Sequence, residues 1–228
     1  MFTKYLKQHS ITRFNESGMA ALYPSATDRA AWDGLSADDK QQAETLIAQY
    51  ASIPYPMRTA TGFMALVHTG SRQADEGPYF LRRRKLCAAV LNCCLHPDAP
   101  LDDVIDGVWC ICEESTWVIS AHNINPIPGA PAAADYPLPR MDGYIDLFAA
   151  QTGMILALTL HLLGKRILKE IPQLHQRMIQ ELDSRILRSF LNHDEYWWMR
   201  RCRRRPWCRG GWVFPRSVSG CRADLSML

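Results

Sequence analysis

Two adjacent stretches with a helical repeat of apolar residues constrain the fold of this 228-residue chain more than any other feature. Residues 142–163 carry apolar side chains at nearly every third or fourth position, and Gly164 is expected to end that helix. A second helical pattern with a charged outer face runs over Lys165–Leu191. The first stretch is apolar on almost every side, and its longest apolar run, 154–163, is too short to span a bilayer. We therefore expect it to be a buried helix.

Shorter helical patterns precede this pair. Ser36 places a side-chain oxygen before two acidic residues, as at the start of a helix, and the basic run 82–85 leads into an apolar stripe. No β-type alternation of any length occurs between residues 36 and 191. The expected helices cover Arg29–Trp32, Ser36 up to the Ile53–Pro56 stop, Arg58–Thr69 up to Gly70, Leu86–Cys94 and Leu101–Ile119. We therefore predict an all-α chain of antiparallel helical hairpins.

The composition is that of a globular protein, with 47% apolar and 21% charged residues, and it excludes a chain that is disordered throughout. The first residues lack the apolar core and cleavage site of a signal peptide, so we expect a cytoplasmic protein. Neither Cys93-Cys94 nor Cys110-Ile111-Cys112 has the two-residue gap of zinc or redox motifs. We expect structural thiols in a reducing compartment, no metal and no cofactor.

Charge divides the chain into two parts. Residues 200–228 hold eight arginines and one acid, a net +7, while the whole chain carries +3, so residues 1–199 carry −4. We predict one helical domain over 1–199 and an irregular tail over 200–228 that is disordered or out of frame. A tail of this kind could instead be an arm for nucleic acid, with Trp207 and Trp212 stacking on bases.

The stretch 109–123 is rich in the side chains that a sugar-binding cleft uses. Flat aromatic rings stack on pyranose faces, and polar tips fix the orientation of the sugar. The residues concerned are Trp109, Glu113, Glu114, Trp117, His122 and Asn123. The alternative is an amphipathic helix in which both tryptophans belong to the core and both glutamates are solvated.

A second aromatic and acidic cluster follows the last predicted helix at 192–199, and contains Tyr196, Trp197 and Trp198. Between the two clusters, residues 125–139 form a long Pro-rich connection without helical or strand periodicity. Aromatic residues at loop positions are often binding residues, and we expect both clusters to line one cleft.

Three blocks of the chain, taken in order, resemble the helical N-terminal region of heparinase II/III-family proteins. The blocks are residues 111–123, 146–152 and 194–199, and the resemblance covers roughly Tyr23–Met199. It implies an α/α toroid of paired helices, normally followed by a β-sandwich, and a lyase that acts on uronic-acid-containing polysaccharide. We expect this chain to form part of an incomplete α/α toroid.

Such a lyase neutralises the uronate carboxylate, removes the C5 proton and returns a proton to the leaving 4-oxygen. The resemblance and this chemistry make His122, Asn123, Tyr144 and Tyr196 the candidate catalytic residues. The candidate substrate-binding residues are Trp109, Glu113, Glu114, Trp117, Trp197 and Trp198. The expected partner is an acidic polysaccharide or oligosaccharide, without a membrane and with nucleic acid disfavoured.

One departure from the family pattern follows Met199. Relatives continue with a Gly/Asn-rich segment that contributes to the site, whereas residues 200–228 are rich in Arg, Cys, Trp and Pro, as expected of a shifted reading frame. On this hypothesis the chain is truncated, its activity is doubtful, and an open helical edge would allow self-association. The alternative hypotheses are a noncatalytic carbohydrate-binding helical protein and a helical module that binds nucleic acid through its basic tail.

Overall fold

The computed structural model of the chain describes residues 22–123, 137–139 and 144–192, and every regular element within these ranges is helical. Two of the elements are single turns, η1 of 3-10 type and η3 of π type. The elements are α3 (Arg29–Asp33), α4 (Ala37–Ala51), α5 (Ala60–Thr69), α6 (Gln73–Leu95), α7 (Asp102–Cys112), η1 (Ser120–His122), α8 (Leu147–Glu170), α9 (Pro172–Leu182), η3 (Asp183–Leu187) and α10 (Arg188–Asn192). The predicted all-α class is confirmed, while the toroid stays a prediction.

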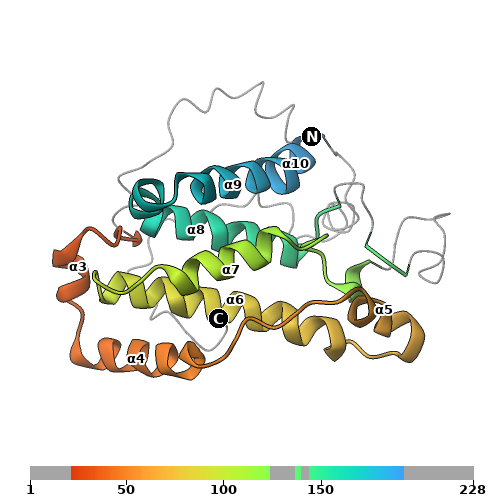
Figure 1. Ribbon diagram of the computed structural model, residues 1–228, viewed down its shortest axis with the longest axis horizontal. Helices are drawn as coiled ribbons and strands as arrows, with labels where there is room; N and C mark the ends of the chain where they lie inside the picture. Colours follow the sequence, from red (N-terminus) through yellow and green to blue (C-terminus); the bar gives the residue numbers. More distant parts are fainter. Residues whose placement is uncertain (1–21, 124–136, 140–143, 193–228) are drawn as a thin grey trace, which may run out of the picture.

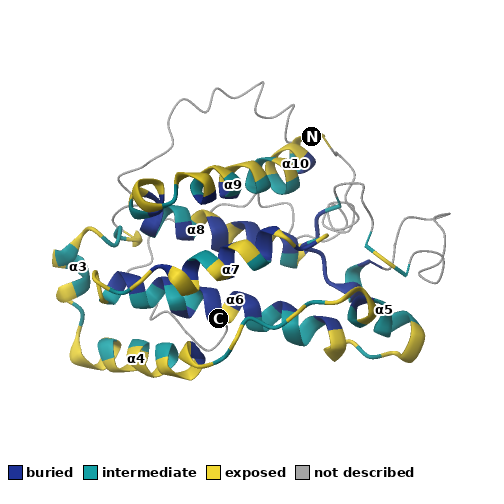
Figure 2. Ribbon diagram, in the orientation of Figure 1, coloured by how far each residue is buried: buried dark blue, intermediate teal, exposed yellow. Residues whose placement is uncertain are grey.

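Helix α6 is the central element of the bundle (Figure 1). It packs against α3, α4 and α5 and against α7 and α8, and α9 packs against both α7 and α8. The buried faces of α6, α7 and α8 are turned toward one another (Figure 2). The side chains at the centre include Leu86, Ile111, Leu156, Ile167 and Met178, each less than 2% exposed.

The helix start predicted at Ser36 is confirmed by its capping bond, and the helix predicted from Arg58 begins two residues later, at Ala60. The Ser36 hydroxyl accepts a hydrogen bond from the Asp39 backbone N–H at 3.1 Å, and the Thr59 hydroxyl accepts one from Gly62 at 3.0 Å. Gly70 ends α5 at φ 74°, in the left-handed region that glycine adopts without a Cβ penalty. Its N–H donates to the Leu66 carbonyl.

The predicted helix over Leu101–Ile119 is wrong at its C-terminal end, because α7 stops at Cys112. Side chains from other elements satisfy the last carbonyls of this helix. Arg177 and Arg185 both donate to the Cys112 carbonyl, at 3.2 and 3.1 Å. Because these carbonyls already have partners, the chain can leave the helix and form the irregular segment 113–119 without losing hydrogen bonds.

Two predicted helix bounds in this region are wrong. Gly164 was expected to end a helix and does not, and Lys165–Leu191 is not one helix. Helix α8 continues through Gly164 to Glu170, and the break falls at Ile171 before Pro172, which opens α9 at its first position. Proline disfavours a helical conformation in the preceding residue, and its fixed φ suits a helix start. A π turn then separates α9 from α10. The start of the first helix is also later than predicted, since α8 begins at Leu147.

The basic run 82–85 lies in the middle of α6 and not at its entry, because α6 begins at Gln73. Three of its four cationic residues, Arg82, Arg83 and Lys85, are buried. Buried cations need paired acids, so this burial points to an internal ion cluster.

The five described cysteines are all free and lie in or beside the core. Burial raises the pKa of Cys94 and of Cys112 to about 12, and that of Cys87 to about 11. These thiols are therefore protonated at neutral pH, in agreement with the structural role predicted for them.

Helix α8 is the one described element that is long and apolar enough to cross a bilayer, with a mean hydropathy of 1.6 over an 18-residue window. Of that window, 44% is buried inside the protein. Core helices pass the same test of length and composition, so the result is weak support for a membrane span.

Candidate functional site

The candidate site lies where η1 ends and α8 begins, around His122 and Asp146. The Asp146 carboxylate is fully buried and makes two bonds with different oxygens. Its Oδ1 accepts from the Ala149 backbone N–H at 2.6 Å and so caps α8, while Oδ2 lies 2.7 Å from His122 Nδ1. A carboxylate held on one imidazole nitrogen fixes the tautomer of the ring and leaves Nε2 as its basic nitrogen.

Aromatic packing fixes the orientation of the His122 ring. The imidazole stacks on Phe148, with ring centroids 5.3 Å apart, and Phe80 meets Phe148 edge to face at the same distance. The His122 side chain is 26% exposed. It is therefore oriented by buried groups and still accessible from solvent, as a proton-transfer group must be.

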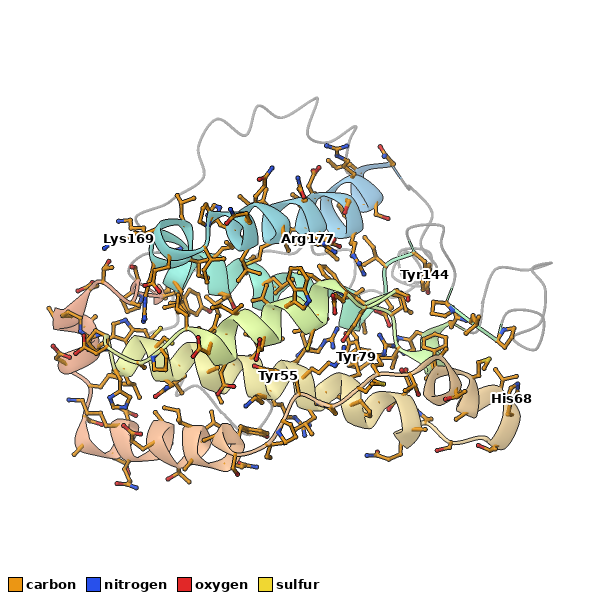
Figure 3. All side chains as sticks on the ribbon, in the orientation of Figure 1. Tyr55, His68, Tyr79, Tyr144, Lys169 and Arg177 are labelled. Atoms are coloured by element: carbon orange, nitrogen blue, oxygen red, sulfur yellow. The ribbon has the colours of Figure 1, made fainter. Side chains whose placement is uncertain are left out.

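Two further candidate residues lie in the same part of the structure. Asn123 is buried, and its Nδ2 donates to the Leu138 carbonyl at 3.1 Å, which ties the short segment 137–139 to the end of η1. Tyr144 is half-buried and precedes Asp146 by two residues (Figure 3). His122 and Asn123 thus close η1, and Tyr144 lies two residues before the carboxylate that holds His122.

A buried ion cluster supports this junction from within. We use "ion cluster" for Arg58, Asp75, Arg82, Arg83 and Glu114. Glu114 sits at its centre, with a side chain 1% exposed, and accepts from all three arginines. The shortest of these bonds joins Arg83 Nη2 to Glu114 Oε2 at 2.7 Å. Three cations surround two acids, so the cluster keeps one unbalanced positive charge.

The ion cluster fixes the segment that leads to His122. Arg58 donates to the Thr116 and Val118 carbonyls at 2.6 and 2.9 Å, and pairs with Asp75 at 2.7 Å. Asp75 in turn accepts the Ser120 backbone N–H at 2.8 Å, where η1 begins. Burial alone lowers the pKa of Arg58, but the hydrogen bond to Asp75 and the charge of Glu114 outweigh burial and raise that pKa above its ordinary value.

Tyr79 connects the ion cluster to the start of α8. Its ring is fully buried beneath the Arg83 guanidinium, 3.3 Å from the ring centroid. Its hydroxyl lies 2.9 Å from the Trp117 carbonyl, 2.8 Å from the Phe148 carbonyl and 2.7 Å from the Thr152 hydroxyl. One phenol therefore joins α6, the 113–119 segment and α8.

Two predicted substrate-binding residues are corrected by their burial. Trp117 is 2% exposed and packs in the core, where its Nε1 donates to the Ile111 carbonyl at 2.9 Å and Arg185 covers its ring. Glu114 is the centre of the ion cluster. Neither side chain can reach a sugar in this structure, because the core encloses both.

Other predicted residues have different outcomes. Trp109 is 48% exposed on the outer side of α7, and Glu113 is exposed one turn later. Both are accessible to a ligand, and their role in binding stays a prediction. Tyr196, Trp197 and Trp198 lie outside the described residues, as do the Arg-rich tail and most of the Pro-rich connection.

Sequence reasoning missed the roles of Asp146, Asp75 and Arg58. Asp146 carried a usable signal, since an aspartate before an apolar periodic run is a typical N-cap. Arg58 and Asp75 carried none, because each looks like an ordinary surface residue near a helix end and their pairing spans 17 positions.

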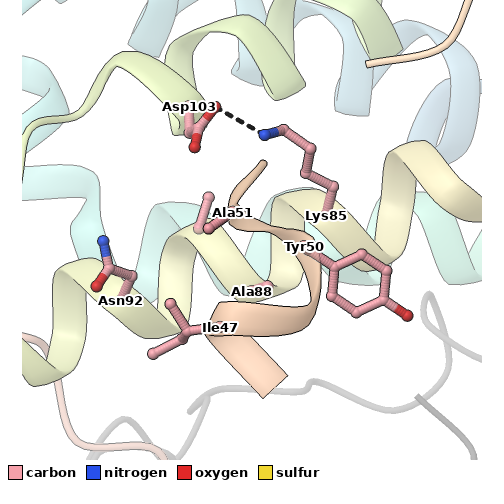
Figure 4. A pocket seen from close by; sticks show the side chains of 8 residues that line it. Ile47, Tyr50, Ala51, Lys85, Ala88, Asn92 and Asp103 are labelled. Atoms are coloured by element: carbon pink, nitrogen blue, oxygen red, sulfur yellow. Dashed lines mark ion pairs between the residues drawn. The ribbon is translucent and has the colours of Figure 1, made fainter. Parts of the chain in front are cut away.

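Among the described residues, no group of three or more His, Cys, Asp or Glu side chains could hold a metal ion. A small hollow between α4 and α6 is lined by Tyr50, Asn92 and Ile47, and by Lys85, whose Nζ pairs with Asp103 at 2.9 Å (Figure 4). It shares no lining residue with the junction around His122.

The sequence matches no model of a known protein family and no curated protein. The functional assignment of the junction therefore rests on its own geometry and on the resemblance of the three sequence blocks.

Tyr79→Phe is expected to change the alkaline stability of the protein. Burial raises the pKa of Tyr79 to about 12, against about 10 for an unfolded tyrosine. The stability that the neutral phenol confers is fully present below pH 10 and is lost as the pH rises from 10 through 12. Urea unfolding should be measured from pH 7 to 11. Above pH 10 the free energy of unfolding of the parent chain should fall more steeply with pH than that of Tyr79→Phe, by up to about 1.4 kcal/mol per pH unit.

The parent-minus-variant difference isolates Tyr79 from the buried cysteines, whose pKa values are also raised and which contribute in the same direction. Equal slopes in the two proteins above pH 10 would contradict the burial of this phenol. At pH 7 the variant should be less stable by about 1–3 kcal/mol, because the buried Trp117 carbonyl loses the phenol O–H.

Proposed function

We propose that this chain is a helical unit of a polysaccharide lyase of the heparinase II/III type, in which His122 transfers a proton during β-elimination on a uronic-acid-containing glycan. The observation that carries the proposal is the pair formed by His122 and the buried Asp146. An imidazole whose Nδ1 is held by a carboxylate and whose side chain is partly exposed is suited to remove a proton from carbon.

The reaction requires three groups, and the junction offers a candidate for each. Asn123 is the candidate neutral hydrogen-bond donor for the uronate carboxylate, which acidifies the C5 proton, and binding requires its Nδ2 to exchange the Leu138 carbonyl for that carboxylate. His122 takes that proton, a C4–C5 double bond forms and the bond from C4 to the leaving oxygen breaks. Tyr144 is the predicted donor of a proton to the leaving oxygen, a role that requires its buried hydroxyl to become accessible when the glycan binds. Trp109 is the accessible aromatic candidate for stacking on a sugar ring.

His122→Gln tests the proposal. We expect the parent chain to generate unsaturated uronide, measured as new ultraviolet absorbance, from at least one of alginate, hyaluronan and heparan sulfate. The variant should lose at least about 100-fold in rate, because a glutamine accepts no proton. His96→Gln is the matched control, since His96 pairs with Glu44 on the surface at 2.8 Å and lies outside the junction.

The outcomes separate the hypotheses. Glycan binding by the parent chain without any unsaturated product would favour a noncatalytic carbohydrate-binding protein. Equal activity of His122→Gln and the parent chain would remove His122 from the mechanism. Neither binding nor product with all three glycans would overturn the proposed function.

A further inference from the structure

Helix α8 presents an apolar stripe that no described element covers. Leu147 and Met154 are 65% and 58% exposed, and Ala150 and Ala157 between and after them are exposed as well. The spacing of three, four and three residues places all four on one side of the helix. We call these four residues the α8 stripe. The sequence has no charged residue from 147 to 164, so the stripe is unbroken by charge.

The exposed apolar surface extends onto the neighbouring helices. Helices α8 and α9 form an antiparallel hairpin that η3 continues, and a Cβ placed on Gly153 would lie only 2.9 Å from Ile186 of η3, so α8 and η3 pack closely there. When two antiparallel helices touch at one residue each, the next residue of each helix points to the same side of the pair. Gly153 and Ile186 are the touching residues, so Met154 and Leu187 point to the same side, and Leu187 is 56% exposed. Exposed apolar side chains on two segments that pack together favour an interaction site.

The first described residues of the chain cross α8 at the end of the stripe. His161 lies one turn beyond Ala157, and its Nε2 is 2.7 Å from the Tyr23 carbonyl. Ala26 donates its backbone N–H to the Leu162 carbonyl at 3.0 Å. Residues 1–21 therefore join the described structure within one or two turns of the stripe, at the exposed Leu22.

The length and chemistry of residues 1–21 suit the stripe. From His161 back to Leu147 the helix spans about 21 Å, at about 1.5 Å per residue, and 21 residues cover that distance even as a helix. The segment carries Phe2, Tyr5 and Leu6, spaced as one face of a helix, with Lys4 and Lys7 between and after them. It therefore combines an apolar side with a charged side.

We propose that residues 1–21 of the same chain dock on the α8 stripe. A tethered segment is present at an effective concentration of about millimolar, whereas a second copy must reach the stripe from solution. The proposal is independent of the lyase function.

Hydrogen–deuterium exchange of the full chain tests the docking. Backbone amides of residues 2–14 should exchange at least about tenfold more slowly than in a free peptide of the same sequence, because docking buries several apolar side chains. Met154→Lys should restore the exchange to the free-peptide rate, since it places a charge at the middle of the stripe. Met57→Lys is the matched control, because Met57 is 78% exposed on the segment between α4 and α5.

Each outcome decides the proposal. Slow exchange that Met154→Lys abolishes and Met57→Lys preserves supports docking in the same chain. Free-peptide exchange rates in the parent chain would overturn it. A dimer that dissociates with Met154→Lys, together with unchanged exchange in residues 2–14, would assign the stripe to a second copy and overturn it too. Ala157→Lys should repeat the effect of Met154→Lys and guards against a local artefact at position 154.

Discussion

Glu114→Gln is expected to lower the free energy of unfolding by about 3–5 kcal/mol, the largest stability effect we predict for a single substitution. The Glu114 carboxylate accepts from Arg58, Arg82 and Arg83, and all four side chains are nearly or fully buried. A glutamine of the same size keeps one acceptor oxygen but removes the charge. Asp75 is then the only acid left in the ion cluster among three cations.

Urea unfolding at pH 7 measures this loss. Glu113→Gln is the matched control, because Glu113 is the adjacent residue with the same side chain and is exposed. It should change the unfolding free energy by no more than about 0.5 kcal/mol. A loss below 1 kcal/mol for Glu114→Gln would show that the three arginines do not depend on its charge.

Gly107→Ala is expected to cost about 2–4 kcal/mol. A Cβ on Gly107 would lie 2.3 Å from the Tyr55 hydroxyl and 2.7 Å from the ring carbon that bears it. The Tyr55 ring cannot move away freely, because its hydroxyl donates to the Asp103 carbonyl at 2.7 Å and Lys85 lies over the ring. The added methyl group must therefore displace the ring and break that hydrogen bond.

Gly164→Ala is the control for this substitution. Gly164 is also a buried helical glycine, but the nearest atom to its Cβ position is 3.9 Å away. Alanine there should stabilise the protein by up to about 1 kcal/mol, because glycine is unfavourable inside a helix. Thermal or urea unfolding of both variants should give opposite signs. A neutral Gly107→Ala would mean that the contact between α7 and Tyr55 is looser than in the structure.

The helices could be predicted from the sequence where the signal is local. Ser36 and Gly70 act within one turn of their own position, through a side-chain cap and a left-handed backbone, so the bounds of α4 and α5 follow from neighbouring residues. The all-α class follows in the same way from periodicity, which depends only on spacing along the chain. Helix caps, a left-handed glycine and apolar periodicity can all be recognised from residues that are close together in the sequence.

The interior of the site could not be predicted, because it depends on contacts between distant residues. Glu113 and Glu114 are adjacent and chemically identical, yet one is exposed and the other is the centre of the ion cluster. Which of the two glutamates is buried depends on the position of Arg58, which lies 56 positions earlier in the chain and pairs with Glu114. The early end of α7 has the same origin, since Arg177 and Arg185 reach back over 65 and 73 positions to the Cys112 carbonyl.

The roles of the residues at the His122 junction stay predictions. His122 and Asn123 could be chosen because polar side chains at helix and loop boundaries often carry function, and Tyr144 was chosen from the lyase chemistry. Trp117 was misplaced because periodicity does not distinguish a tryptophan in the core from one in a cleft. The part of the second cluster that contains Tyr196, Trp197 and Trp198 lies outside the described residues, so the predicted shared cleft stays a prediction.

The Asp146 carboxylate connects the His122 ring to the first turn of α8. One carboxylate holds the imidazole with one oxygen and the first turn of α8 with the other. Any event that draws His122 away from Asp146 also changes the charge distribution at the head of a 24-residue helix. The orientation of the His122 ring and the capping of the first turn of α8 therefore depend on the same carboxylate.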